Sequence, residues 1–235
     1  MSKKVFLAFT AAATLLLLPA SSAFATTPAF AVTAKRDCNP GPNKNLTGCD
    51  FTGKKLVKAN LANSNLTNAN FFKANLTGAS LSKVNLTGAN FTQANLTGVN
   101  LRNTTIKGAY FTKATMLRTN LDNVQGNLVN FKGTNLTGSS MMNSSWRTSN
   151  FDNANLTHVN MGFAKLGARP TLVHHDSAYK TEGSSFIGAN LTSANLSKVT
   201  PNGVLMNKTT KLPQDWQYRK GLLLGPSVNL KNTEI

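Results

Sequence analysis

Residues 74–98 read ANLTGASLSKVNLTGANFTQANLTG, a run of quintets in which a large apolar residue returns every five positions. A small or short side chain stands two positions before each of them, and Asn, Thr, Gly and Ser fill most other places. A fixed period of this kind decides the architecture of a chain before any single helix or strand is considered. The period runs from 46 to 166, and only Gly126 departs from it; the central residues are Leu46, Phe51, Leu56, Leu61, Leu66, Phe71, Leu76, Leu81, Leu86, Phe91, Leu96, Leu101, Ile106, Phe111, Met116, Leu121, Phe131, Leu136, Met141, Trp146, Phe151, Leu156, Met161 and Leu166.

A period of five fits neither an α-helix nor a β-strand. On a helix the apolar residues would spread around the whole circumference. On a strand, where side chains alternate, successive central residues would point to opposite faces. The period instead predicts short extended pieces separated by turns, for which Asn, Gly and Ser are suited. Stacked units of this kind bury a continuous core that no single unit could bury, so we expect an all-β solenoid.

A second period of twenty residues, or four quintets, lies within the first. Phenylalanine recurs at this interval and occupies no other central position between 46 and 166. The spacing predicts a coil of twenty residues with one Phe per coil, stacked into a structural core ladder with about 4.8 Å between coils. The ladder residues are Phe51, Phe71, Phe91, Phe111, Phe131 and Phe151.

The quintets, such as 74–78 and 94–98, resemble the A-(D/N)-L-x-x motif of the pentapeptide repeat family. The resemblance covers residues 45–166 and 184–200. It implies a right-handed quadrilateral β-helix with four quintets per coil, in agreement with the spacing of the Phe residues. On function the resemblance implies little, because the family includes scaffolds, effectors and DNA-mimicking protectors of topoisomerase.

The first 25 residues are typical of a secretory signal peptide. Lys3 and Lys4 precede an apolar run at 5–18, and the small-x-small sequence AFA follows at 23–25 and again at 29–31. Cleavage would leave a chain that begins at Thr26 or Val32. No later apolar run approaches about 20 residues, so we expect no transmembrane segment in the mature chain. The predicted location is the periplasm, the cell envelope or the medium.

The remaining chain divides where the period stops and resumes. Residues 26–44 form an N-terminal lead or cap, and 45–166 form the regular β-helix. Residues 167–183 break the pattern and are either a loop or a degenerate coil, because twenty residues separate Leu166 from Phe186. Further repeats occupy 184–200, and 201–235 hold a hairpin and partial repeats.

The C-terminal segment reads as two strands, 211–218 and 221–226, with a turn near 219–221. It looks like the LP-x-x-W…G-x-L-x-GP hairpin near the ends of some bacterial pentapeptide repeat proteins. Such a hairpin would cap the open edge of the last coil, which otherwise invites edge-to-edge pairing. Exposed coil ends also predict end-to-end self-association of the solenoid.

Gly126 interrupts the core between Ile106 and Trp146, its neighbours one coil away on either side. Our hypothesis is that the Trp146 ring leans into the space left by Gly126. The rival is a shift of register that brings Leu128 inward. Replacement of Gly126 by Leu separates the two, because overpacking destabilises a core only where the space is already filled.

Few residues could carry chemistry. Cys38 and Cys49 are the only cysteines and form a candidate disulfide, which export would permit. His174, His175 and Asp176 lie together in the irregular segment, which makes it a candidate interaction loop. Adjacent histidines in an extended segment point apart, so we predict no metal site there. No nucleophile, base and orienting group can be combined, so we predict no enzyme, no catalytic residue and no cofactor.

The chain carries a formal charge of +17, with 25 Lys and Arg against 8 Asp and Glu. Assignment to four columns spreads these cations around the solenoid instead of collecting them in a stripe. The preferred interpretation is a non-enzymatic, exported scaffold that presents a basic, polar surface for interaction or structure in the cell envelope or outside it. The partner is a protein or an anionic polymer that the sequence does not identify.

Two alternatives remain for the charge. Diffuse positive charge attracts polyanions, so the chain could bind an anionic envelope polymer or nucleic acid; equally, the cations could only keep an otherwise uncharged surface soluble. A topoisomerase-protecting DNA mimic ranks lower, because such a mimic is acidic and because export separates the chain from a cytosolic enzyme.

Overall fold

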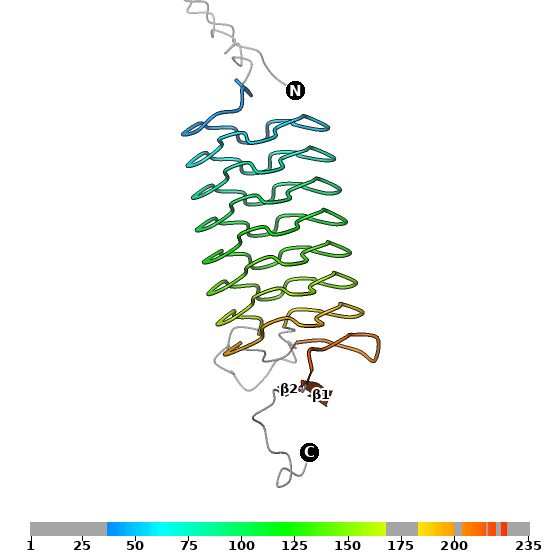
Figure 1. Ribbon diagram of the computed structural model, residues 1–235. Helices are drawn as coiled ribbons and strands as arrows, with labels where there is room; N and C mark the ends of the chain where they lie inside the picture. Colours follow the sequence, from blue (N-terminus) through cyan, green and yellow to red (C-terminus); the bar gives the residue numbers. More distant parts are fainter. Residues whose placement is uncertain (1–36, 168–182, 200–203, 215, 220–221, 225–235) are drawn as a thin grey trace, which may run out of the picture. The chain divides into compact units, whose positions relative to one another are not determined.

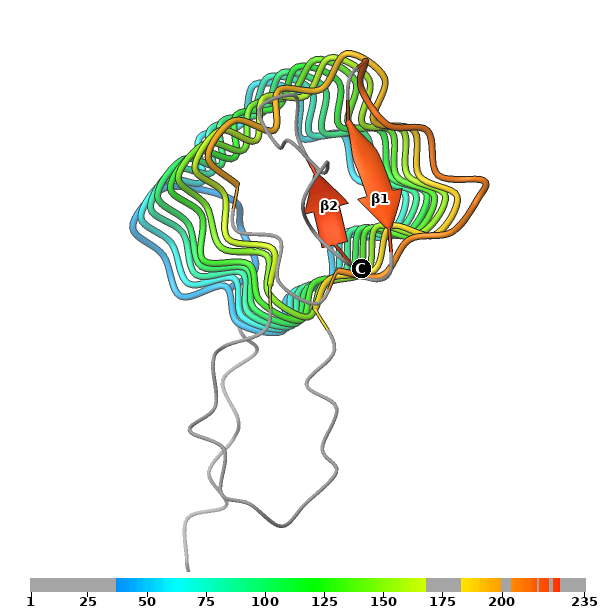
Figure 2. The ribbon, with the colours of Figure 1, turned by 90° about the horizontal axis from the view of Figure 1, so that it is seen from below.

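The computed structural model describes residues 37–167, 183–199, 204–214, 216–219 and 222–224. The predicted signal peptide lies outside these ranges. The described residues all belong to one compact unit. Its successive coils stack one on another (Figure 1), and a view along the stack shows the four sides of each coil (Figure 2). The prediction of a right-handed quadrilateral β-helix is confirmed.

Neighbouring coils are joined by parallel backbone pairing at every quintet. Asn45 pairs with Asn65, twenty residues later, and the same interval holds up to the pair Ser145 and Lys165. The Leu46 amide donates to the Asn65 carbonyl at 2.7 Å, and the Asn65 amide donates to the Lys44 carbonyl at 2.8 Å. Pairing starts with the Asn43 amide, which donates to the Ala62 carbonyl at 3.0 Å, slightly before the predicted start at 45.

The turn at each corner explains the recurring Asn-Leu-Thr sequence. The residue two places after the centre adopts positive φ, for example +66° at Gly78, which glycine adopts without steric cost. The residue before the centre supports the same turn with its side chain. Asn75 Oδ1 accepts hydrogen bonds from the Thr77 amide at 3.1 Å and from the Thr77 hydroxyl at 2.7 Å. The Asn and Thr of the motif therefore stabilise the turn at the corner.

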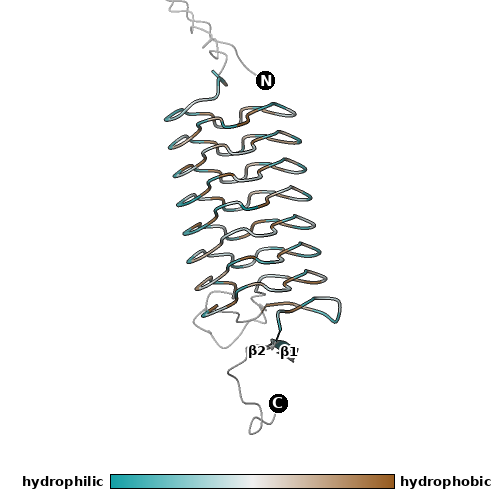
Figure 3. Ribbon diagram, viewed as in Figure 1, coloured by the Kyte–Doolittle hydropathy of each residue, from teal (hydrophilic) through white to brown (hydrophobic). Residues whose placement is uncertain are grey.

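The core is a set of stacked columns of central side chains, and hydrophobic residues recur at corresponding places in each coil (Figure 3). In the column that we call the Phe column, neighbouring rings are stacked with centroids 4.6–5.1 Å apart. This agrees with the predicted spacing of the coils. The Phe column comprises Phe51, Phe71, Phe91, Phe111, Phe131, Phe151 and Phe186, all of them buried.

A second column, which we call the Trp column, contains the break in the repeat. A Cβ atom added to Gly126 would lie 2.2 Å from Trp146 Cζ3 and 3.2 Å from Ile106 Cγ1. Trp146 is fully buried, whereas the Leu128 side chain is 55% exposed. The Trp146 ring therefore occupies the space above Gly126, and the alternative of a register shift is wrong. The column comprises Leu46, Leu66, Leu86, Ile106, Gly126, Trp146 and Leu166.

The register across the irregular segment distinguishes a loop from a coil. Ser185 pairs with Asn150, 35 positions earlier instead of the usual 20, so fifteen additional residues leave the coil. Phe186 accordingly stacks on Phe151, with 4.7 Å between ring centroids, and not on a member of the Trp column. A degenerate coil would have placed Phe186 beneath Leu166. The register of the described residues therefore excludes a degenerate coil and requires fifteen residues more than one coil; residues 168–182 themselves lie outside the described ranges.

The hairpin consists of β1 (Gln217–Arg219) and β2 (Leu222–Leu224), which pair antiparallel. The first strand is shorter than predicted, because Lys211 pairs with Asn190 and so still belongs to the stack of coils. Leu212 and Trp216 pack against the core. The two strands lie at the C-terminal end of the stack (Figures 1 and 2).

Candidate interaction surface

A disulfide joins Cys38 and Cys49, whose Cα atoms lie 5.6 Å apart. Cys49 is buried two positions before Phe51, so the bond ties the N-terminal lead to the first coil. The same segment is held by Lys44, whose Nζ lies 3.3 Å from Asp37 Oδ2. Hydrogen bonds from the Asn39 amide and the Lys44 ammonium group lower the pKa of Asp37. The end of the solenoid is therefore fastened covalently.

The candidate interaction loop with His174, His175 and Asp176 lies outside the described residues. Among the residues that the structure does describe, no group of three His, Cys, Asp or Glu side chains could hold a metal ion. The search for an interaction site therefore turns to the outer surface of the coils.

Carboxylates are few on that surface, and the solenoid uses them internally. Asp122 Oδ1 accepts hydrogen bonds from the Ser140 hydroxyl and, at 2.9 Å, from the Met142 amide. Asp152 binds the next coil in the same way, through Ser185 and Ile187. Within the described ranges, Lys44 with Asp37 is the single ion pair. No other basic side chain in these ranges lies within ion-pair distance of a carboxylate.

One side of the solenoid, which we call the Thr side, carries no carboxylate among its described residues. Its residues are the quintets 55–59, 75–79, 95–99, 115–119, 135–139, 155–159 and 190–194. Threonine follows the central residue in most of these quintets, whereas Leu117 takes that place in the fourth. Lys55, Lys58 and Arg118 are the cations of these quintets, and Lys211, which pairs with Asn190, adds a cation on the next coil.

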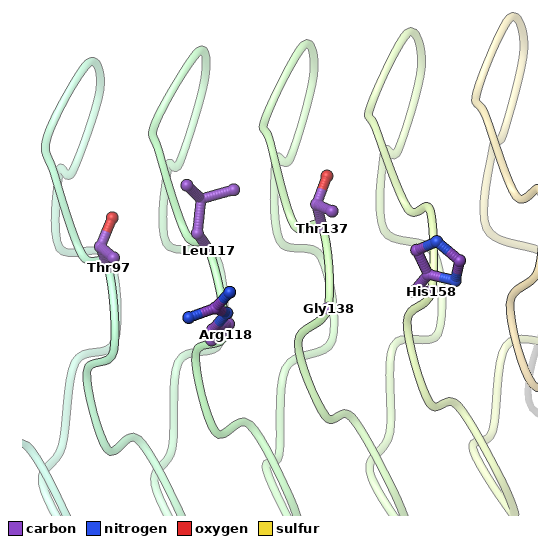
Figure 4. Close-up of a pocket in the computed structure, with 6 residues that line it drawn as sticks. All are labelled: Thr97, Leu117, Arg118, Thr137, Gly138 and His158. Atoms are coloured by element: carbon purple, nitrogen blue, oxygen red, sulfur yellow. The ribbon is translucent and has the colours of Figure 1, made fainter.

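A hollow of about 450 Å³ lies on the Thr side. Figure 4 shows Thr97, Leu117 and Thr137 in one row across successive coils, with Arg118 next to Leu117. The Leu117 side chain is partly buried between its two threonine neighbours, whereas Arg118 and His158 are exposed. The lining residues are Thr97, Leu117, Arg118, Thr137, Gly138 and His158.

Glycines at the corners create the room for this hollow. Arg118 stands between Gly98 and Gly138, one coil away on either side. A Cβ atom added to Gly98 would meet nothing within 4 Å, and one added to Gly138 would meet only Arg118 Cγ, at 3.7 Å. The arginine side chain is therefore bordered by open corners instead of by other side chains.

Sequence reasoning placed Lys58 and Arg118 on one side but did not single out the hollow. The signal was present, because positions 98, 118, 138 and 158 fall at the same corner when the chain is written in rows of twenty. The net charge of a whole column does not reveal this corner, and His158 has no second histidine next to it in the sequence.

A four-sided helix of five-residue units, with one continuous apolar core and a polar outer surface, defines a solenoid scaffold. The chain belongs to the pentapeptide repeat family. The family's sequence model, described as pentapeptide repeats, matches in 8 copies at residues 45–82, 69–108 and 106–143. Proteins of this family are typically non-enzymatic scaffolds. Among curated proteins, none matches the chain significantly.

One solved structure, that of HetL, shares the fold. The chain is similar to HetL, a pentapeptide repeat protein involved in heterocyst differentiation regulation from the cyanobacterium Nostoc sp. strain PCC 7120, with a TM-score of 0.58 and 19% identity over 71% of this chain and 86% of HetL. Similarity extends to QnrB1, a plasmid-mediated fluoroquinolone resistance protein, with a TM-score of 0.39 and 18% identity over 73% of this chain and 90% of QnrB1. A pentapeptide repeat protein from the thylakoid lumen of Arabidopsis thaliana is 26% identical over 60% of this chain and 85% of its own, with a TM-score of 0.22. At these levels the likeness to HetL concerns the fold alone.

Proposed function

We propose that the chain is an exported, non-enzymatic scaffold that presents a basic, polar surface for interaction or structure in the cell envelope or outside it. The observation that carries this proposal is the excess of unpaired cations on a rigidly paired solenoid. The described carboxylates are engaged in holding coils or the N-terminal lead together. The outer charge is therefore free to meet a partner.

Export is supported by two independent features. Residues 1–25 have the basic start, apolar run and small-x-small end of a signal peptide. The disulfide between Cys38 and Cys49 belongs to an oxidising compartment, because the cytosol keeps most thiols reduced.

Export is tested by expressing the chain with a C-terminal tag in a bacterial host, separating the cell fractions and determining the N-terminus by mass spectrometry. We expect a processed chain in the exported fraction that begins at Thr26 or Val32. A matched variant with Leu15 and Leu16 replaced by Arg interrupts the apolar run, so it should remain in the cytosol. Recovery of the unprocessed chain from the cytosol in both cases would contradict the proposal.

Binding of anionic polymers is the second candidate, and the Thr side favours it because its cations face no carboxylate. The test is titration of the exported chain with duplex DNA and with an anionic envelope polymer over a series of salt concentrations. Binding to one polymer that survives about 0.15 M salt supports this candidate, since diffuse attraction is screened beyond roughly 8 Å under those conditions. Weak binding to both polymers, lost together as salt rises, would leave the charge as a means of solubility.

The DNA-mimic alternative has less support. A mimic of the DNA backbone presents negative charge, whereas residues 45–166 carry twelve Lys and Arg against three Asp. A negatively charged mimic attracts basic partners, whereas the positive surface of this chain attracts acidic ones.

A further inference from the structure

The hollow on the Thr side combines two polar donors with an apolar floor. Arg118 and His158 stand at the same corner two coils apart, which corresponds to about 10 Å at the spacing of paired strands. Gly138 lies on the coil between them and leaves the gap unfilled. An extended chain that follows the stack could therefore meet the arginine first and the histidine two coils later.

Two threonine hydroxyls on the coils of Gly138 and His158 already donate within their own corners. The Thr137 hydroxyl donates to Asn135 Oδ1 at 2.7 Å, and the Thr157 hydroxyl donates to Asn155 Oδ1 at 2.6 Å. Both hydroxyl protons are thus used within the corner. Leu117 adds an apolar side chain where the neighbouring coils have Thr97 and Thr137. Such a surface suits the C–H faces of sugar rings.

We propose that this hollow binds an acidic polysaccharide, with Arg118 and His158 contacting two acid groups carried on alternate sugars. The assignment rests on the proposed function, because it names the partner class of the exported scaffold. Arg118 contributes a guanidinium fork, which pairs with carboxylates and sulfates through two N–H donors. His158 contributes a ring N–H. No described residue of the Thr side is a carboxylate, so none of them repels an anionic chain that lies on this side.

Nucleic acid fits this surface less well. Single-stranded nucleic acid is held by aromatic side chains on which its bases stack. Among the described residues, the exposed aromatic side chains Tyr110 and Phe163 belong to other sides of the solenoid. The described part of the Thr side has no Phe, Tyr or Trp side chain and offers only the His158 ring beside Leu117 and the threonines.

The test is calorimetric titration of the exported chain with hyaluronan oligosaccharides, which carry an acid group on alternate sugars, at about 0.15 M salt. Arg118→Gly and His158→Asn are each expected to weaken binding roughly tenfold, the loss typical of one hydrogen bond to a charged group. Gly keeps the φ of +51° found at Arg118, so this variant should fold normally. Thermal unfolding of each variant verifies that the fold is retained.

Lys113→Gly is the matched control, because Lys113 also has positive φ, +56°, and contacts a glycine corner on the next coil, Gly133. It lies on the Phe column side, so its removal should change the affinity less than about twofold, as expected of a diffuse charge. Equal losses in all three variants would overturn the site in favour of diffuse attraction. Failure of the unaltered chain to bind hyaluronan, or equally tight binding of neutral dextran, would overturn it as well.

A further arm uses single-stranded and duplex DNA of matched length. Tighter binding of DNA that depends on Arg118 would assign the hollow to nucleic acid and overturn the polysaccharide. Correct export with none of these affinities would leave the scaffold function standing while the site fails, whereas retention in the cytosol would refute the export on which both proposals depend.

Discussion

The Phe column and the Trp column lie on adjoining sides of the same coils but fill the core in different ways. In the Phe column one residue type repeats, and stacked rings are inclined to each other by only 1–18°. In the Trp column the largest and the smallest residues are neighbours, and Trp146 meets Phe131 edge-on at 74°. The Phe column packs regularly because every coil contributes the same side chain. The Trp column packs only because the large Trp146 side chain lies next to the small Gly126.

The largest expected effect is in the repeating column. Phe111→Ala removes a ring that stacks on both Phe91 and Phe131, with centroid distances of 4.9 and 5.1 Å. We expect the free energy of unfolding to fall by about 3–5 kcal/mol, because rigidly paired coils cannot close over the cavity. Chemical denaturation measures the loss. Thr112→Ala, on the outer surface of the same coil, is the control and should change stability by less than about 0.5 kcal/mol.

Gly126→Leu should have the next largest effect, about 1–3 kcal/mol of destabilisation, because the new Cβ would lie 2.2 Å from Trp146 Cζ3. Trp146→Leu in the same chain should restore much of the loss by returning an ordinary pair to the column. Thermal unfolding of the single and double variants gives the coupling between the two sites. An unchanged melting temperature in Gly126→Leu would show that the pair is not complementary.

Ser149→Ala tests the hydrogen bonds that support the Trp column. We expect it to lower the free energy of unfolding by about 1 kcal/mol. The Ser149 hydroxyl donates to the Gly126 carbonyl at 2.9 Å and accepts from the Val129 amide at 3.1 Å. Ala109 occupies the corresponding corner two coils earlier, so the smaller side chain fits the space. Faster hydrogen exchange at the Val129 amide should accompany the loss. Exchange at an unchanged rate would mean that the hydroxyl is dispensable.

The smallest effect concerns the outer side of the Phe column, at Asp50. Hydrogen bonds from the Thr52 side chain and then from the Thr52 amide lower the pKa of Asp50 below its ordinary value of 3.8. The ionised form therefore stabilises the folded chain, and this stability is present above pH 3.8 and is lost as the pH falls through the lowered pKa. Melting temperatures measured downward from about pH 5 should fall less steeply in Asp50→Asn than in the unaltered chain. Identical pH profiles would show that the hydrogen bonds to Thr52 do not favour the carboxylate.

The differences between prediction and structure follow from how far each pattern reaches along the chain. The Phe spacing predicted the coil length, because every coil had to bury the same side chain in the same column. The first hairpin strand was predicted too long. The segment that begins at Lys211 has the composition of a strand, but Lys211 itself pairs with Asn190 in the solenoid. Composition alone cannot distinguish the two kinds of extended backbone.

The candidate site was less accessible to sequence reasoning. His158 and Arg118 are forty residues apart in the sequence, and only the stacking of coils brings them to one corner. The hollow also depends on the small side chains around them, since Gly98 and Gly138 leave the corners open. A search for ligands close together in sequence leads to His174 and His175 instead.

No helix among the described residues is long and apolar enough to cross a membrane. The path of the described chain is instead a stack of paired extended segments, and its periods are visible without a structure. The sequence by itself determined the five-residue unit, the coil of twenty residues and the fourfold section, because a continuous core requires the same kind of residue at every turn. Only the tertiary structure decided how Trp146 fills the space above Gly126, that the irregular segment is not a degenerate coil, and which outer side chains meet across coils. Those outcomes depend on contacts between residues 20 to 35 positions apart, and the shapes and directions of side chains at such contacts are not encoded in any single quintet.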